Sequence, residues 1–200
     1  MAFDTNNGYA VPLRREDGLH KVKVRWPTDE EWIDRYKNWN INISNLGRGI
    51  SETQIESFKA DLALYQKIRE EESLELVAEE AQKVIEVISR CEVTGVSLGL
   101  DEAVVDMTIV NGMKVKHTLR LPTTAEVTQF QRSSARVMDL PHGRQTVRTN
   151  LNAGSSLYDK CHRGHEGYVN GVPITHRDSA LRAVITECER EAQPGESEDF

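Results

Sequence analysis

One short segment of the 200-residue chain combines residue types that bind metal ions: Cys161, His162 and His165 lie within five positions. A thiolate and two imidazoles are three of the four ligands that zinc takes in a tetrahedral site, and His142 or His176 would supply the fourth. Structural zinc sites usually show two spaced ligand pairs, whereas this sequence contains no Cys-x-x-Cys pair. We therefore predict a polar loop after a helix, without a bound metal, and keep a small metal-binding regulatory module as the second hypothesis.

The same cysteine is accompanied in the sequence by the residue types of a catalytic trio. Cys161 would be the nucleophile, His142 the base, and Asp139 or Asp159 the carboxylate that orients the base. The order and spacing of these residues match no local signature of a cysteine enzyme. We therefore predict a non-enzymatic protein with no catalytic residue and no cofactor, and a cysteine-dependent enzyme is the third hypothesis.

Composition narrows the class of protein. Hydrophobic residues make up 38% of the chain and charged residues 28%, which is the balance of a folded globular protein. The formal net charge of −7 argues against general binding to nucleic acid, because such binding needs a basic surface. No apolar run approaches the roughly 18 residues of a membrane span, and no secretory signal opens the sequence. Three cysteines form no disulfide framework, so we expect a cytoplasmic protein without membrane association.

The two halves of the chain resemble each other. The clearest match sets Val24–Glu31 against Leu119–Glu126, because both segments place Arg-x-Pro-Thr shortly before a glutamate. Four shorter matches keep the same order at offsets of 93 to 100 positions: Asp17-Gly18 with Asn111-Gly112, Gly47-Arg48 with Gly143-Arg144, Leu64–Lys67 with Leu157–Lys160, and Val84-Ile85 with Val184-Ile185. Ordered matches at a nearly constant offset are the signature of an internal repeat, so we predict a tandem duplication.

Local signals predict the same elements in each half. Asp17-Gly18 and Asn111-Gly112 favour β-hairpins, because these residue types adopt the backbone angles of a tight turn. Thr28 and Thr123 follow a proline and precede a glutamate by three positions, which is the pattern of a helix N-terminal capping box. Each half is therefore predicted to begin with a hairpin that leads into a capped helix.

The predicted fold class is α+β, as a tandem duplication of a ββααα module. After the first helix of each module we expect a polar, glycine-bearing linker, at Asn38–Ser51 and at Asp139–Gly154, and then two further helices. The modules span residues 9–92 and 103–192, and we expect the acidic tail at 193–200 to be disordered. Two similar halves predict a pseudo-dimer, packed about an approximate two-fold axis.

The hairpin that leads through Arg-x-Pro-Thr into a helix, at Val24–Glu31 and at Leu119–Glu126, resembles the start of phage tail assembly chaperones and related small tail structural proteins. The resemblance implies a non-enzymatic protein that binds a structural subunit or the tape-measure protein during tail assembly. A structural component of the virion neck or tail is the neighbouring interpretation. The resemblance implies a location in the host cytoplasm or in the virion. From the duplication we expect a homo-oligomer or a pseudo-dimeric monomer.

A protein that binds a partner needs anchor residues, and aromatic and arginine side chains are the commonest anchors. Trp26 and Trp32 are predicted to pack in the core. Trp39 stands between two asparagines at the end of its helix, so we expect it to be exposed. The predicted partner-binding residues are Tyr36, Trp39, Arg132 and Arg136.

Overall fold

The computed structural model describes residues 2–47, 50–140 and 144–192. Within these residues the chain is a mixed α and β protein with six α-helices and antiparallel sheets, which confirms the predicted mixture of helices and strands. The predicted tail at 193–200 lies outside the described residues. No helix in the described part of the chain is both long enough and apolar enough to cross a membrane.

The first half of the chain folds into two hairpins and three helices. In chain order the elements are β1 (Gly8–Arg15), β2 (Gly18–Arg25), α1 (Asp29–Lys37), β3 (Asn40–Gly47), β4 (Ile50–Glu56), α2 (Phe58–Ile68) and α3 (Ala78–Ser89). The predicted first hairpin and the three predicted helices are present. The hairpin of β3 and β4 is an additional element between the first two helices.

The second half repeats this order with two additions, β5 and β10. Its elements are β5 (Glu92–Leu98), β6 (Glu102–Thr108), β7 (Lys114–Arg120), α4 (Thr124–Ser134), β8 (Ala135–Leu140), β9 (Arg144–Thr149), α5 (Leu151–Cys161), β10 (His162–Glu166) and α6 (Ile174–Ala192). A short 3₁₀ turn at Val110–Gly112 joins β6 to β7. Asn111 and Gly112 adopt positive φ in this turn, as the sequence predicts for a hairpin.

The segments predicted as linkers contain strands, so the unit in each half is ββαββαα and not ββααα. Asn38–Ser51 holds β3 and the start of β4, and Asp139–Gly154 holds the end of β8, all of β9 and the start of α5. From Asn40 to Ile43 asparagine alternates with isoleucine, which is the two-residue period of a strand. Asparagine is rare in strands, so the residue types argue against a strand although the alternation favours one. The structure has the strand, because β3 pairs with β4 over these residues.

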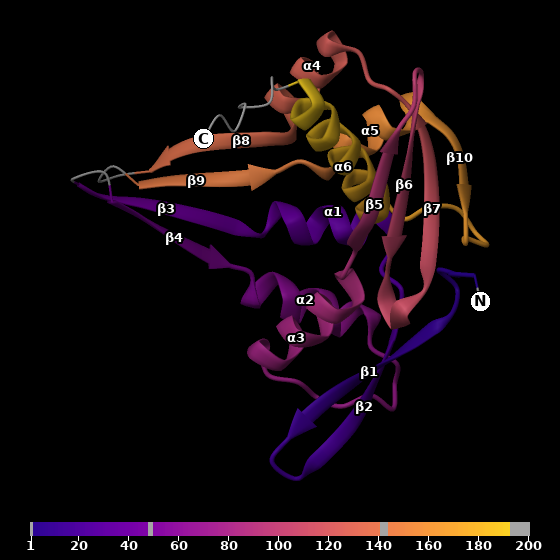
Figure 1. Cartoon of the computed structure of the whole chain (residues 1–200). Coiled ribbons are helices and arrows are strands. Elements are labelled where there is room, and N and C mark those ends of the chain that lie inside the picture. Colours follow the sequence, from indigo (N-terminus) through magenta and orange to yellow (C-terminus); the bar gives the residue numbers. More distant parts are fainter. Residues whose placement is uncertain (1, 48–49, 141–143, 193–200) are drawn as a thin grey trace, which may run out of the picture.

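The named strands lie in three antiparallel sheets. β1 and β2 form a two-stranded sheet, and β10, β7, β6 and β5 form a four-stranded sheet in that order. The third sheet has the strand order β4-β3-β9-β8, so it combines one hairpin from each half, and we refer to it as the hairpin sheet. Figure 1 shows the hairpin sheet extending away from the helices as an arm.

The hairpin sheet does not have the strand order of a two-fold pseudo-dimer. A two-fold axis pairs identical surfaces, so it would place the two first strands, or the two second strands, side by side. Instead β3, the first strand of one hairpin, pairs with β9, the second strand of the other. The predicted two-fold arrangement is therefore wrong for this sheet, whose two hairpins are joined head to tail.

Both halves contribute to one hydrophobic core. The prediction that Trp26 and Trp32 are core residues is confirmed, because both are buried. The centroid of the Trp26 ring lies 5.4 Å from that of His176 in α6, and Arg177 of the same helix forms an ion pair with Asp29 in α1. Because burial of apolar surface drives folding, each half stabilises the other.

The first predicted capping box is present. Thr28 Oγ1 accepts a hydrogen bond from Glu31 N at 3.2 Å, and Glu31 Oε2 accepts one from Thr28 N at 2.9 Å. The Arg25 guanidinium donates to both carboxylate oxygens of Glu31, at 2.6 and 2.7 Å, and lowers the pKa of that carboxyl. These contacts join the end of β2 to the start of α1 across the proline turn.

The same contacts recur 95 positions later. Thr123 Oγ1 accepts from Glu126 N at 3.3 Å, and Glu126 Oε2 accepts from Thr123 N at 2.9 Å. Arg120 donates to both oxygens of Glu126, at 2.6 and 2.8 Å, and with the Thr123 backbone lowers the pKa of Glu126 to about 2. In both turns the arginine also donates to the carbonyl oxygen of the next residue. The second turn therefore reproduces this set of contacts in the first.

Candidate functional site

The ligands of the hypothetical metal site differ sharply in burial. Cys161 is the last residue of α5 and is completely buried, which raises the pKa of its thiol. His162 and His165 lie on β10, with 3.0 Å between Nε2 of the first and Nδ1 of the second. His142 lies outside the described residues. Across the residues that the structure describes, no three histidine, cysteine, aspartate or glutamate side chains are placed to hold a metal ion.

The cysteine of the hypothetical catalytic trio is enclosed as well. A nucleophilic cysteine needs access to substrate and a lowered thiol pKa, and Cys161 has the opposite properties. Asp159, one of the two candidate carboxylates, pairs with Arg177 at 3.3 Å. Burial also raises the pKa of Cys91 to about 12 and raises the pKa of Cys188. All three thiols therefore have the properties of packing residues.

The structure contains a buried network of histidines and tyrosines that the sequence motifs do not predict. His117 Nδ1 lies 2.8 Å from the Tyr158 hydroxyl, and His117 Nε2 lies 3.0 Å from the Tyr168 hydroxyl. The same Tyr168 hydroxyl lies 3.2 Å from His176 Nδ1. Burial lowers the pKa of His117 to about 4 and that of His176 to about 3, so both rings are neutral at pH 7.

The signal that places His117 in the core is the alternation of β7. Val115 and Leu119 face the core, and His117 stands midway between them in the same two-residue series. A histidine on such a face needs hydrogen-bond partners, and tyrosines from outside the strand supply them. The network joins β7 to α5 and α6, and its groups are directed at one another, so its role is to hold the body together.

Two of the predicted partner-binding residues, Tyr36 and Trp39, instead surround an internal arginine. The guanidinium carbon of Arg35 lies 4.9 Å from the centroid of the Tyr36 ring and 5.4 Å from that of Trp39. The Trp39 ring is half-buried, and its indole N–H is buried without an acceptor among the described residues. The expectation that Trp39 is exposed is therefore wrong, because its ring packs on Arg35 and, at 5.1 Å between centroids, on Tyr36.

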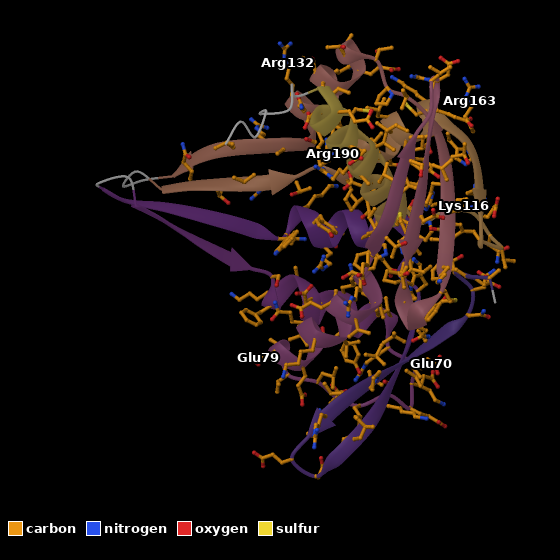
Figure 2. All side chains as sticks on the ribbon, viewed as in Figure 1. Glu70, Glu79, Lys116, Arg132, Arg163 and Arg190 are labelled. Carbon is orange, nitrogen blue, oxygen red and sulfur yellow. The ribbon has the colours of Figure 1, made fainter. Side chains whose placement is uncertain are left out.

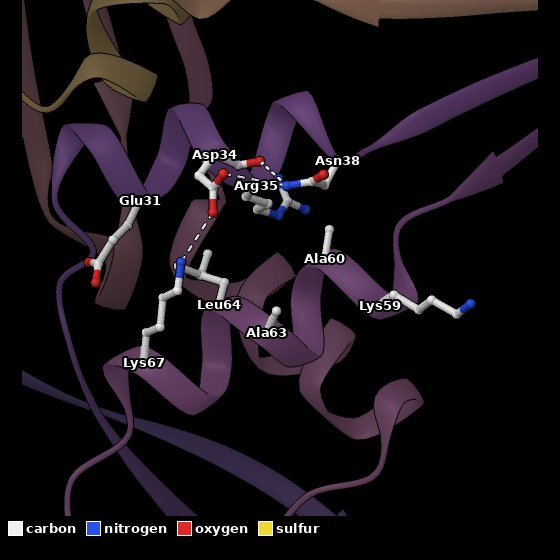
Figure 3. A pocket seen from close by; sticks show the side chains of 9 residues that line it. All are labelled: Glu31, Asp34, Arg35, Asn38, Lys59, Ala60, Ala63, Leu64 and Lys67. Atoms are coloured by element: carbon white, nitrogen blue, oxygen red, sulfur yellow. Dashed lines mark hydrogen bonds and ion pairs between the residues drawn. The ribbon is translucent and has the colours of Figure 1, made fainter.

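The arginine beneath these rings forms a buried ion pair. Arg35 Nε donates to Asp61 Oδ1 at 2.6 Å, and the pair joins α1 to α2. Beside it the two helices flank a groove of about 280 Å³, drawn in Figure 3. Lys67 Nζ and Asp34 Oδ2 lie 3.1 Å apart across this groove, and Asn38 donates to the carbonyl oxygen of Asp34 at 2.9 Å. These charged groups hold each other, so the groove is better explained as helix packing than as a ligand site.

The other two predicted partner-binding residues are exposed. Arg132 lies in the last turn of α4, and Figure 2 shows its side chain pointing away from the body. Arg136 lies on β8, beside Val137, whose side chain is 57% exposed. The structure therefore does not bring the four predicted residues together, but it places Arg136 at the rim of the hairpin sheet.

The two outer strands of the hairpin sheet, β4 and β8, are the candidate partner-binding site. No strand in the described part of the chain pairs with the outer edge of either one. An uncovered edge presents backbone N–H and C=O groups that can pair with a further strand. The hairpin sheet therefore offers two strand-length surfaces for addition of another chain.

No protein-family model matches the chain, and neither a curated protein nor a solved structure matches it. The shared core, the matched capping turns and the two edges of the hairpin sheet are therefore the observations from which a function can be argued.

Proposed function

We propose that the protein is a non-enzymatic assembly protein of a phage-type particle, which binds a structural protein during tail assembly or within the neck or tail. The observation that carries this proposal is the hairpin sheet, an arm that projects from a packed body and whose two outer strands have no further strand partner among the described residues (Figure 1). Proteins associate through such edges because backbone hydrogen bonds supply affinity along the whole strand. The protein would act in the host cytoplasm or remain in the virion.

The proposal includes a tandem duplication of one ββαββαα unit. The equal order of elements and the two matched capping turns support it. A further match follows α2 and α5: Arg69 bridges to Val24 in the first half, and His162 pairs with Leu119 in the second. Arg69 and His162 are 93 positions apart, and Val24 and Leu119 are 95 positions apart. Both offsets already occur among the sequence matches. A duplicated unit that associates with its own copy gives one chain two related surfaces for assembly.

The two alternative functions draw less support from the geometry. A metal-binding module would need Cys161 beside His162 and His165, but the cysteine is buried while His165 is exposed. A cysteine-dependent enzyme would need a reachable thiolate, and burial favours the protonated thiol at Cys161. The projecting sheet has no role in either hypothesis, whereas an assembly protein would use it directly.

Native mass spectrometry and negative-stain electron microscopy of the untagged full chain test the proposal together. We expect oligomers that carry no metal, that form a larger fraction of the protein as its concentration rises, and that appear as rings or filaments. A chain that remains a monomer at every concentration would overturn the proposal. A monomer that carries one zinc ion would favour the metal-binding hypothesis in its place.

Two valines with similar exposure provide a matched pair of variants. Val137 on β8 is 57% exposed, and Val169, which lies between β10 and α6 and outside the hairpin sheet, is 59% exposed. Val137→Glu adds a charge to the edge that is proposed to bind, so we expect loss of the oligomer. Val169→Glu adds the same charge elsewhere and should leave the oligomer intact. Equal effects of the two changes would argue against the hairpin sheet as the binding surface.

A further inference from the structure

The junction inside the hairpin sheet is a template for a contact between chains. It joins β3, the first strand of one hairpin, to β9, the second strand of the other, in an antiparallel pair. The four paired positions are Ile41 with Val147, Asn42 with Thr146, Ile43 with Gln145, and Ser44 with Arg144. The chain therefore already contains one head-to-tail junction between two hairpins.

The two outer edges, which pair with no strand in the described part of the chain, correspond to the two sides of this same junction. β8 is the first strand of its hairpin, and its outer edge corresponds to the edge with which β3 meets β9. β4 is the second strand of its hairpin, and its outer edge corresponds to the edge with which β9 meets β3. Inside the chain, the β3 edge and the β9 edge pair with each other. The corresponding edges of β8 and β4 lie at the two sides of the sheet.

We propose that the partner at these edges is a second copy of this chain, whose β4 pairs antiparallel with β8 and continues the hairpin sheet from chain to chain. The inference rests on the proposed function as an assembly protein and identifies the first partner. A head-to-tail contact uses two different surfaces, so every added copy presents the same free edge again. Such a contact produces a closed ring or a helical filament, and not an isolated two-fold dimer.

The register of the contact follows from the two matched halves. The capping turns align the first half with the second at an offset of 95, which takes β3 onto β8. The hairpin ends pair Asn40 with Glu56 and Ala135 with Thr149, which takes β4 onto β9 at an offset of 93. Applied to the internal junction, these offsets predict four pairs between chains: Arg136 with Gln54, Val137 with Thr53, Met138 with Glu52, and Asp139 with Ser51.

The residue types at these positions suit the predicted register. No residue would stand directly opposite one of like charge in the four pairs. Arg136 would oppose Gln54, and the acidic residues Glu52 and Glu56 stand two positions before and after Gln54 in the sequence. Cross-strand neighbours of opposite charge stabilise antiparallel strands, so the register gains from the arginine on β8.

Disulfide trapping between full-chain variants that each carry one added cysteine tests both the partner and the register. One variant carries Thr53→Cys and the other carries Val137→Cys, and the two are mixed under mild oxidation. Within one chain β4 and β8 are separated by two strands, about 14 Å across the sheet, so this bond cannot form inside a molecule. Glu52→Cys with Met138→Cys tests the adjacent pair, because narrow and wide pairs alternate along antiparallel strands.

We expect a mixed dimer of the two variants in at least one of the adjacent pairs, and little dimer from either variant alone. A chain that carries both Thr53→Cys and Val137→Cys should give a ladder of covalent multimers. The unmodified chain, with its three natural cysteines, is the background control, and Ser51→Cys mixed with Val137→Cys is the control for a register displaced by two residues.

The outcomes separate this inference from the proposed function. Preferred bonds between two Val137→Cys chains would show a two-fold contact, and an oligomer without any of these bonds would show another surface; either result overturns the inference and leaves the assembly function standing. A chain that is monomeric under every condition overturns both. Rings and filaments are both compatible with the inference, because each continues the same contact.

A pair of charge reversals supplies an independent test. Arg136→Glu would place a negative charge among the acidic positions of β4 in the next chain, so we expect the concentration for half-maximal assembly to rise about tenfold. Arg163→Glu makes the same change at an exposed arginine of β10, in a different sheet, and should alter assembly by less than about twofold. Circular dichroism must show that both variants keep their fold. Equal changes in the two variants would contradict pairing at β8.

Discussion

The Arg35 guanidinium and the Asp61 carboxylate form an ion pair in which both partners are buried, with 2.6 Å between Nε and Oδ1. Their contact joins α1 to α2, close to the point where β3 leaves the body. Asp61 Oδ2 is buried and has no hydrogen-bond partner among the described residues. A buried pair of this kind adds little net stability, but removal of one partner leaves the other charge without compensation.

We therefore predict that Asp61→Ala lowers the free energy of unfolding by about 3–5 kcal/mol, because Arg35 is left charged and buried. Replacement of both partners together, by Arg35→Met with Asp61→Leu, should recover most of this loss. Asp34→Ala removes the exposed pair with Lys67 and should cost less than about 1 kcal/mol. Urea unfolding at pH 7 measures all three, and a double variant as unstable as Asp61→Ala would contradict the explanation.

The second half accommodates its buried aspartate differently. Gly154 stands 93 positions after Asp61, and the Asp178 carboxylate of α6 occupies the space above this glycine. Asp178 pairs with Arg182 at 2.7 Å, and that guanidinium lies 5.0 Å from the centroid of the Phe130 ring. An arginine, an aspartate and an aromatic ring thus meet in both halves, although the residues occupy different positions in the chain.

This arrangement predicts that Gly154→Ala destabilises the protein. A methyl group at position 154 would lie 1.8 Å from Asp178 Oδ1 and 3.2 Å from its Cβ, so helix α6 or the Asp178 side chain would have to move. We expect a loss of roughly 1–3 kcal/mol in the free energy of unfolding, the usual cost of overpacking. Gly164→Ala is the control, since nothing lies within 4 Å of the added methyl group there. Equal stability of the two variants would show that Asp178 moves aside freely.

The features that could be predicted from the sequence are those determined by neighbouring residues. The capping boxes at Thr28 and Thr123 join atoms three residues apart, and the Asn111-Gly112 turn depends on the backbone of two adjacent residues. The additional hairpins were locally visible too, in the alternation of Asn40 to Ile43, but the low strand preference of asparagine outweighed that period.

The candidate site could not be predicted, because it depends on pairing between distant segments. Ile41 meets Val147 across more than a hundred residues, and several strand orders are compatible with two hairpins of similar sequence. The prediction that Trp39 is exposed is wrong for a related reason: its neighbours in the sequence are polar, whereas Arg35 and Tyr36 pack against its ring in three dimensions. Of the four predicted partner-binding residues, Arg136 lies at the edge of the hairpin sheet, on β8. The sequence predicts the end of a helix and a linker at this place.

The two capping turns predict equal energetic contributions. Thr28→Ala and Thr123→Ala each remove the hydroxyl that accepts from the backbone of a glutamate, at 3.2 and 3.3 Å. We expect each change to lower the free energy of unfolding by about 1 kcal/mol, the typical cost of losing an N-cap. Thr124→Ala, one position beyond the second cap, should change it by less than about 0.5 kcal/mol. Thermal or urea unfolding of the three variants gives the comparison, and a loss at one cap without a loss at the other would contradict energetic equivalence of the turns.

The buried histidines predict that the protein loses stability as the pH falls. Burial lowers the pKa of His117 to about 4 and that of His176 to about 3, whereas both titrate near 6.5 in the unfolded chain. Between pH 6.5 and about 4 the unfolded state therefore binds more protons than the folded state, so the free energy of unfolding decreases as the pH decreases. The slope contributed by each histidine is at most about 1.4 kcal/mol per pH unit.

His176→Phe tests this origin of the pH dependence. The phenyl ring keeps the aromatic packing against Phe3 and Trp26 but cannot be protonated. We expect the slope of the free energy of unfolding between pH 6 and pH 4.5 to decrease by as much as one histidine contributes, while stability at pH 7 changes by the cost of one hydrogen bond to Tyr168, about 1 kcal/mol. His20→Asn, at the tip of the first hairpin, is the surface control. A histidine that stays neutral in the folded state but is protonated in the unfolded state must add to this slope. An unchanged slope in His176→Phe would therefore contradict the explanation and assign the loss of stability in acid to other groups.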